Sequence, residues 1–343
     1  MANNIVPGNN GGVGKTNTAF SAIPVMSAAN LTVLYEIGNP NKSWIPGRAI
    51  NSVTKFTPNK AYYIIAKNAI DLEAHLVPPI SGTVEPPDEE EPGGEYNATA
   101  SAFFTRAESV GTLSTDEKDA YSQLVDSLLS AGLYNRFRVL KPYLGGSAAV
   151  AALNAISSSY TSSFIGSPII STTGATFNGS TQYENIPFNL SEIMLVEKNN
   201  ISVGIYIRSG LNEGWVFGAA DASSGLQLNP RYENAAYGYN GSLEAPITVA
   251  NTSAQGLYTL SRVSSNDSRL YKGAAQIGPT EATTNNAGLP AQNVYVGARN
   301  LNGAANSHFQ GEVGLFFIAA GFNPSEMIVI NNIFQTFLTS LGR

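Results

Sequence analysis

The chain has 343 residues and a formal net charge of −6, and charged side chains make up only 13% of it. At about 150 residues per domain, this length predicts two or three structural units with enough residues to bury a core. The low charge predicts a surface of uncharged hydrogen-bonding groups. Because no basic excess is present to hold a phosphate backbone, nucleic acid is not an expected partner. The absence of cysteine and the presence of only two histidines exclude disulfides, thiolate metal sites and multi-histidine metal centres, and we expect no cofactor.

Residues 1–30 are rich in Asn and Gly and show no hydrophobic periodicity. They are predicted to form an extended arm that orders only against a partner. The first residues carry neither the basic nor the apolar region of a signal peptide. No run of about 18 apolar residues exists to span a bilayer, so we expect no membrane insertion.

The segment from Gly11 to Thr16 ends in Gly-Lys-Thr, which invites comparison with a phosphate-binding loop. Such a loop needs a further glycine at the position that Asn9 occupies here, and it follows a buried strand and opens a helix. Only Ile5 and Val6 precede it, and Pro7 comes directly after them. We therefore interpret the segment as part of the flexible arm and not as a nucleotide site.

Residues 31–77 contain short runs of β-branched and aromatic residues separated by turns rich in Pro and Asn. This pattern predicts a small N-terminal β-domain. Residues 78–100 follow as a predicted acidic, Pro-rich linker. Within it, Glu85 to Gly94 combines several prolines with contiguous carboxylates, which favours a stiff, solvated chain over a metal site.

Residues 101–166 are predicted to form a short helical connector. Ser114 and Glu117 have the spacing of a capping box, and Gly132 supplies a stop, which predicts a helix over 114–131. A second short helix is predicted over 135–140 and a third in the Ala-rich stretch 148–156. The connector is too small for a core of its own, so we expect it to pack on the following domain or on a neighbouring chain. The apolar face of its first helix consists of Tyr121, Leu124, Val125, Leu128 and Leu129.

Residues 167–343 change to a period of two, with short strand-like segments from Thr176 to Ile318. Their number and spacing are typical of a β-sandwich. Ser325 and Glu326, after Pro324, are then predicted to cap a closing helix with one apolar face. The predicted fold is mainly β, and its C-terminal part resembles a concanavalin A-like or laminin-G-like β-sandwich.

The segment from Leu228 to Gly241 is the best candidate for a recognition surface. Tyrosine rings stack on sugar rings, and Asn and Arg hydrogen-bond to hydroxyl groups. The alternative is that Tyr237 and Tyr239 only pack on one face of an edge strand. Arg299 and His308 join the site if the loops meet at one rim. The candidate carbohydrate-binding residues are Arg231, Tyr232, Tyr237, Tyr239, Asn240, Arg299 and His308.

No catalytic residue is predicted. No strand carries the closely spaced acids that a sandwich glycosidase uses, and the serines lack a Gly-x-Ser-x-Gly turn. With His75 and His308 as the only histidine bases, a nucleophilic triad is not expected. Trp215 and Phe217, two residues apart, are expected to point into the core.

Three segments carry a resemblance to a known group of proteins. They are Leu140 to Gly146, Ser171 to Gly179, and the closing Leu341 to Arg343. Over residues 103–343 the chain resembles virion structural proteins of phages that infect Bacteroidetes hosts. The resemblance implies a tail-fibre, tail-tip or head-fibre protein with an N-terminal virion anchor and a distal lectin-like sandwich, but no ligand residue is carried over from it.

We therefore expect a structural protein on the surface of a phage particle that displays its sandwich for attachment to host surface glycans. Residues 31–77 are expected to anchor it to other virion proteins. We expect a homotrimer for three reasons: the arm is too polar to fold alone, the connector helix over 114–131 has one apolar stripe to bury, and phage fibres commonly use three-fold symmetry. Two alternatives stay open: an architectural capsid or tail decoration without a ligand, and a polysaccharide-degrading tailspike enzyme.

Overall fold

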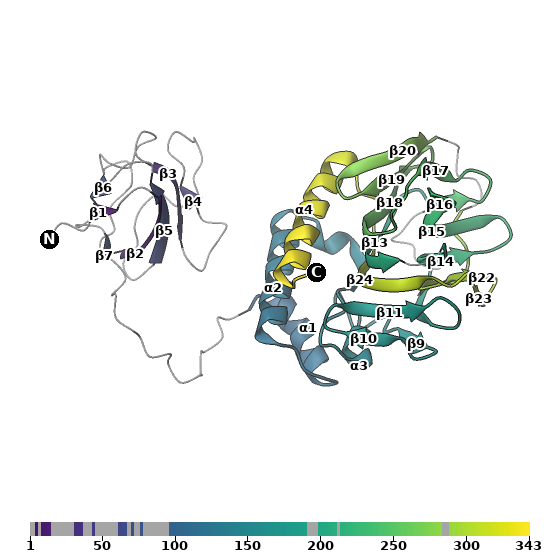
Figure 1. Ribbon diagram of the computed structural model, residues 1–343, viewed down its shortest axis with the longest axis horizontal. Coiled ribbons are helices and arrows are strands. Elements are labelled where there is room, and N and C mark those ends of the chain that lie inside the picture. The colour runs from purple at the N-terminus through teal and green to yellow at the C-terminus, as the bar shows by residue number, and fades with distance from the viewer. Residues whose placement is uncertain are drawn as a thin grey trace. The chain divides into compact units, whose positions relative to one another are not determined.

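The computed structural model describes residues 96–190, 198–210, 213–282 and 288–343, together with the backbone of short strands before residue 78. The chain divides into two compact units, Met1–Pro92 and Gly93–Arg343. Both are drawn in Figure 1, and each is described by itself.

The first unit contains a five-stranded sheet in the order β4-β3-β5-β2-β7 and a separate pair of β1 with β6. β2 pairs antiparallel with β5 from the predicted β-domain. The prediction of an arm is therefore wrong for residues 8–14, because a backbone ladder forms without help from side chains. A strand in an antiparallel sheet also differs from the loop before a helix that phosphate binding requires. The strands are β1 (Asn4–Ile5), β2 (Gly8–Gly14), β3 (Leu31–Glu36), β4 (Ser43–Trp44), β5 (Ala61–Ala66), β6 (Ile70–Asp71) and β7 (Leu76–Val77).

The predicted linker lies outside the described residues up to position 95. From Ala98 the chain is already helical, in α1 (Ala98–Glu108), with Asn97 as its N-cap. The end of the linker was therefore predicted too late. An Asn side chain that accepts a hydrogen bond from a first-turn amide, here that of Thr99, is a common way to begin a helix.

The second unit is a sandwich of two sheets, which confirms the predicted fold class. One sheet has eight strands in the order β10-β11-β24-β13-β18-β19-β20, with β8 also paired to β24. These strands are β8 (Phe137–Lys141), β10 (Ile169–Ser171), β11 (Gly174–Asn178), β13 (Ile201–Gly210), β18 (Gly256–Ser264), β19 (Asp267–Lys272), β20 (Ala275–Glu281) and β24 (Gln310–Ala319).

The other sheet has nine strands in the order β17-β16-β15-β14-β21-β12-β9, with β22 and β23 attached beside β14. All its pairs are antiparallel except β14 with β22. Its strands are β9 (Ser163–Ile165), β12 (Tyr183–Asn189), β14 (Phe217–Ala220), β15 (Ser224–Tyr232), β16 (Ala235–Ser242), β17 (Ile247–Ala250), β21 (Asn293–Val296), β22 (Arg299–Leu301) and β23 (Ala304–Asn306).

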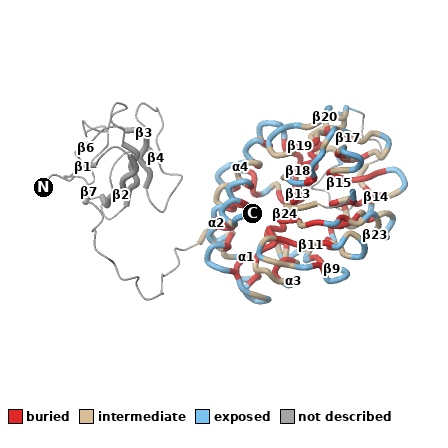
Figure 2. The backbone as a smooth tube through the Cα atoms, viewed as in Figure 1, coloured by how far each residue is buried: buried red, intermediate tan, exposed pale blue. Residues whose placement is uncertain are grey.

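The main core lies between the two sheets, where Figure 2 shows the buried residues in red. On β13, Val203 and Ile205 point into it, and Leu226 and Leu228 on β15 meet them from the other sheet. Burying an aliphatic side chain of this kind contributes roughly 1.5 to 3 kcal/mol. Because the period of a strand is two, the residues between these positions face away from this core.

A second core lies between the eight-stranded sheet and the helices. On β24, Phe316 belongs to the core between the sheets, whereas Phe317 belongs to the core under the helices. Phe317 stacks on Phe334 of α4 (Pro324–Ser340) with the ring centroids 5.1 Å apart. The helices therefore cover one face of the sandwich, as Figure 1 shows.

The connector belongs to this same unit. Its helix α2 (Thr115–Ser130) has the predicted capping box. Its apolar face is buried inside the chain except for Leu129, which is 38% exposed. The helix predicted over 135–140 is wrong: a short 3-10 turn at Tyr134–Arg136 leads into β8, because pairing with β24 overrides the local pattern. In the Ala-rich stretch only α3 (Ala148–Ala151) is helical. Since β8 and β9 are strands of the sandwich, the sandwich begins earlier than residue 167.

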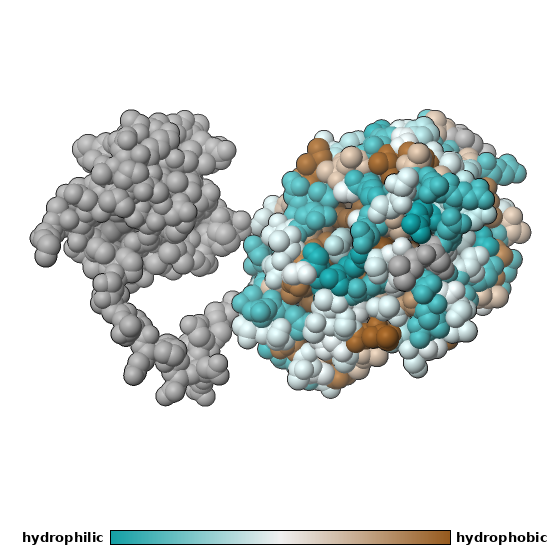
Figure 3. Space-filling view, in the orientation of Figure 1, coloured by the Kyte–Doolittle hydropathy of each residue, from teal (hydrophilic) through white to brown (hydrophobic). Residues whose placement is uncertain are grey.

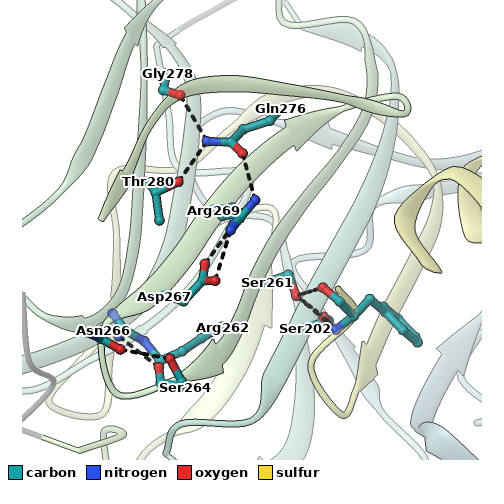
Figure 4. A network of polar contacts seen from close by, with 11 residues as sticks. Ser202, Ser261, Arg262, Ser264, Asn266, Asp267, Arg269, Gln276, Gly278 and Thr280 are labelled. Atoms are coloured by element: carbon teal, nitrogen blue, oxygen red, sulfur yellow. Dashed lines mark hydrogen bonds and ion pairs between the residues drawn. The ribbon is translucent and has the colours of Figure 1, made fainter. Parts of the chain in front are cut away.

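The start of α4 is fixed by hydroxyl groups on the sheet. The Ser202 and Ser261 hydroxyls lie 2.8 Å apart (Figure 4). Both accept a hydrogen bond from the amide of Phe322, at 2.9 Å. Asn323 then caps the helix, two residues before the predicted cap at Ser325. No helix in the described ranges is long and apolar enough to cross a membrane.

Candidate functional site

The outer face of the nine-stranded sheet is the face that α1, α2 and α4 leave uncovered (Figure 1). Since Leu226 and Leu228 point into the core, Gln227 and Asn229 between and beside them face outward. The register pairs Gln227 with Tyr239, and Asn229 with Tyr237. The strand register therefore places two tyrosines of β16 on this outer face.

Four aromatic side chains surround a cavity of about 320 Å³ at this place. The ring centroids of Trp215 and Tyr239 lie 5.8 Å apart, and those of Tyr232 and Tyr237 lie 5.9 Å apart. Polar groups complete the wall. The full lining is Glu213, Trp215, Asn229, Tyr232, Tyr237, Tyr239 and Ser307.

The cavity is assembled from separate chain segments by backbone contacts. The amide of Trp215 donates to the carbonyl of Ser307 at 2.9 Å. A Cβ on Gly214 would lie 2.1 Å from the carbonyl oxygen of His308, so only glycine allows this approach. The amide of Glu233 donates to the Glu213 carboxylate at 3.0 Å. This bond connects the segment that contains Glu213 and Trp215 to the β15–β16 hairpin.

The hairpin turn itself determines where Tyr232 lies. Glu233 and Asn234 have φ of 49° and 60°. Two central residues with positive φ are typical of the tight turn that matches the twist of paired strands. The turn places Tyr232 opposite Ala235 and leaves its side chain exposed at 44%, with its ring packed edge-on against Tyr237.

Arg299 lies beside the cavity. Its guanidinium carbon is 5.4 Å from the centroid of the Trp215 ring, and its Nε donates to the Asn306 side chain at 2.9 Å. Burial lowers the pKa of Arg299, and the nearby Tyr239 acts in the opposite direction. An arginine stays charged under such a shift, so a fixed cation borders the aromatic rings.

Further aromatic groups continue along the same face. Tyr183 on β12 and Tyr295 on β21 are stacked with their centroids 4.6 Å apart, and His308 lies 6.1 Å from Tyr183. Desolvation lowers the pKa of His308, which favours the neutral imidazole at neutral pH. Desolvation also raises the pKa of Tyr295, so its hydroxyl stays protonated.

The structure brings together most of the predicted site residues. Tyr232, Tyr237 and Tyr239 line one cavity, and Arg299 lies against its Trp215. Arg231 is not part of the lining; its amide donates to the side chain of Asn229.

Asn240 was assigned wrongly, because it alternates with Tyr239 and is paired with the core residue Leu226. It is only 4% exposed, and its carbonyl accepts the Nε of Arg262.

Trp215 was expected in the core, which is also wrong. The amide of Val216 donates to the carbonyl of Leu228, while Phe217 is the residue paired with Leu228. One extra residue is thus inserted, as in a β-bulge, and the alternation is reset. Val216 and Phe217 are both buried, whereas Trp215 turns outward. No sequence signal marks this bulge, so local periodicity could not have identified Trp215.

The remaining residues of this face are contributed by distant segments. Tyr183, Tyr295 and Ser307 lie on separate strands or loops, and only the sheet order brings them near the hairpin. Among the residues that the structure describes, no group of three or more His, Asp or Glu side chains is placed to hold a metal ion. The chemistry available here is stacking and hydrogen bonding, with one carboxylate, Glu213, in the cavity wall.

No protein-family model matches the chain, and no curated protein matches its sequence. Similar solved structures include domain 4 of AbnA, a GH43 extracellular arabinanase from Geobacillus stearothermophilus, in complex with arabinotriose. It is 12% identical with a TM-score of 0.40, and the match covers 56% of this chain and 97% of that one.

Two further matches cover only part of the other chain. The structure of botulinum neurotoxin type C, whose cell entry depends on two ganglioside molecules, is 8% identical with a TM-score of 0.44 over 59% of this chain and 52% of that chain. A Trypanosoma rangeli sialidase is 10% identical with a TM-score of 0.42 over 62% of this chain and 38% of that chain. At these identities the likeness bears on the fold alone.

Proposed function

We propose that this protein binds carbohydrate on the outer face of its nine-stranded sheet. The observation that supports this most strongly is the cavity of about 320 Å³ in which Trp215, Tyr232, Tyr237 and Tyr239 meet Glu213, Asn229 and Ser307. Aromatic rings stack on the apolar faces of sugars, and the polar groups can hydrogen-bond to hydroxyls. If Tyr237 and Tyr239 only packed against each other on an edge strand, Trp215 from a different segment would not be expected to line the same cavity.

We also propose that the sandwich is displayed on a phage particle. The support is the resemblance over residues 103–343, whose three segments converge in space. The Arg343 guanidinium donates to the carbonyls of Pro142, Tyr143 and Thr172 at 2.7, 2.8 and 2.6 Å. The segments that carry the resemblance therefore form one structural unit, which is consistent with a shared architecture. In this proposal the first unit anchors the protein to the particle.

Binding is tested with the full chain on an array of host-derived capsular and lipopolysaccharide glycans. We expect at least one glycan to bind, and we expect Tyr237→Ala combined with Tyr239→Ala to abolish the signal. The matched control is Ile169→Ala combined with Ile328→Ala, two exposed apolar truncations away from this face, at 69% and 52% exposure. If the tyrosine variant binds as well as the control, this face is not the binding site.

The enzyme alternative has one specific observation in its favour, the carboxylate of Glu213 in the cavity wall. Glycoside hydrolysis commonly uses two carboxyl groups roughly 5 to 10 Å apart. Incubation of bound glycans with the protein, followed by a reducing-sugar assay, separates the two functions. Release that is lost in Glu213→Gln would establish the enzyme, whereas binding without release supports the proposal.

A further inference from the structure

The outer face of the nine-stranded sheet carries a second aromatic group that the cavity does not include. Tyr295 lies between Val294 and Val296, which are both fully buried between the sheets. By alternation, the Tyr295 ring faces the outer side, where it stacks on Tyr183 with an interplanar angle of 30°. We call the stacked pair Tyr183 and Tyr295 the tyrosine platform.

Arg299 connects the platform to the cavity. Gly218 on β14 pairs with Tyr295 of the platform, and a Cβ on Gly218 would lie 3.2 Å from Cγ of Arg299. The Arg299 side chain therefore passes directly over a glycine next to Tyr295 and reaches the Trp215 ring. Its bond to Asn306 fixes the guanidinium in this place. The cavity and the platform are thus connected by a continuous row of neighbouring side chains on this face.

The dimensions of this stripe follow from the sheet. The cavity tyrosines are on β16 and Tyr183 is on β12, and the intervening order is β16-β15-β14-β21-β12. Four spacings between strands correspond to roughly 19 Å. A single sugar ring cannot span that length, whereas a chain of several sugars can.

The residues between the rings favour a sugar chain over a protein partner. Arg299 and Gly218 separate the two aromatic groups, so a hydrogen-bonding side chain and a glycine stand there in place of aliphatic side chains. The core of a protein interface is depleted in charged groups. An oligosaccharide, in contrast, presents apolar ring faces and hydroxyls in alternation along its length.

We propose that the cavity and the tyrosine platform form one elongated site for an internal stretch of a linear oligosaccharide or polysaccharide, which runs across the strands with Arg299 between the two ends. This inference rests on the proposed carbohydrate-binding function. A single shallow contact buries little area and binds weakly, because the ligand loses freedom on binding. A second contact along the same sugar chain therefore raises the affinity strongly.

The test is a length series. Gluco-, xylo-, arabino- and manno-oligosaccharides, from the monosaccharide upward, are titrated into the full chain by calorimetry. We expect affinity to rise with length until both ends of the site are occupied. We expect Tyr183→Ala to weaken the longest ligand about tenfold, the scale of losing stacked aromatic contacts, with no effect on the shortest ligand that binds. Tyr183→Phe, which keeps the ring, should retain affinity and controls for folding.

Different failures point to different errors. If all lengths bind equally and only Tyr237→Ala with Tyr239→Ala weakens them, the cavity alone holds a terminal sugar and the elongated site is wrong, although carbohydrate binding stands. If no oligosaccharide in the series and no glycan on the host array binds, both the elongated site and the proposed function are wrong. If Tyr183→Phe loses affinity as fully as Tyr183→Ala, ring stacking at the platform is overturned.

Discussion

Arg343 shows how a single residue can hold distant segments together. Its guanidinium donates to four carbonyl groups, those of Pro142, Tyr143, Thr172 and Gly314, at 2.6 to 2.8 Å. Burial lowers its pKa to about 10, so it is still charged at neutral pH. A planar guanidinium with five donors can satisfy carbonyls in several directions, which a lysine cannot do.

We expect Arg343→Lys to lower the free energy of unfolding by about 2 kcal/mol, because buried carbonyls lose their donors. Urea denaturation of the full chain measures this, with Arg231→Lys as the control, since no hydrogen bond described here depends on the Arg231 guanidinium. Equal stability of the Arg343→Lys variant and the wild type would contradict this role.

His308 predicts a pH dependence. Desolvation lowers its folded pKa below the ordinary value of 6.5. The unfolded chain then binds more protons than the folded chain between the two values, so stability is complete above 6.5 and declines as the pH falls toward the folded value. Thermal unfolding across this range should show a smaller decline in His308→Gln. An identical pH profile for the two proteins would show that His308 is not desolvated.

The residues of the site were predictable only in part. Tyr237 and Tyr239 could be placed on one face because hairpin alternation is a local property of the sequence. The same alternation should have placed Asn240 inside, where the structure has it. Trp215 was missed because a bulge reset the alternation. Tyr183 was missed because the order of strands in a sheet cannot be predicted from local periodicity.

Among the elements, β8 and β12 are joined across the sandwich by a buried polar cluster. The Lys141 ammonium lies 3.0 Å from the Glu184 carboxylate, and both side chains are fully buried. The Tyr143 and Ser162 hydroxyls also donate to that carboxylate. Desolvation lowers the pKa of Lys141, and Glu184 opposes this shift. The cluster thus links a strand of each sheet.

Removing one partner of a buried ion pair is expected to lower the free energy of unfolding more than removing both partners. Glu184→Gln should lower the free energy of unfolding by roughly 3 to 5 kcal/mol, since Lys141 is left as an unpaired buried charge. The double variant Lys141→Met with Glu184→Gln should recover most of this loss. Denaturant unfolding of both variants measures the difference, and a double variant no more stable than Glu184→Gln would rule out this coupling.

Strands and helices with strong periodicity were predicted well, and short ambiguous segments were not. The capping box of α2 and the continuous apolar run of β24 are local signals, and both elements are present. Residues 135–140 were predicted as a helix, but the observed β8 depends on pairing with β24, which is far away in sequence. Residues 8–14 carry almost no side-chain signal and still form a strand.

For the whole molecule, the surface agrees with the composition. The face of the second unit seen in Figure 3 is mostly hydrophilic or neutral, with apolar residues in small separate patches. The apolar side of α2 is covered by its own chain except at Leu129, so the apolar stripe of this helix is no longer a reason to expect a trimer. The trimer remains a prediction from the resemblance to phage fibre proteins.

Mass measurement by light scattering on the full chain tests this prediction. We expect a mass corresponding to three chains, each of 36.2 kDa. Several copies would also multiply a weak contact with each glycan through a high effective concentration. A monomer at all concentrations would remove the trimer and this route to tight attachment.

The central claim is that carbohydrate binds on the outer face of the nine-stranded sheet. A crystal structure of the full chain with an oligosaccharide selected on the host array tests it most directly. We predict one sugar ring in the cavity, against Trp215 and Tyr239, and a further ring over Tyr183. A bound oligosaccharide elsewhere on the protein, with these rings uncovered, would contradict it.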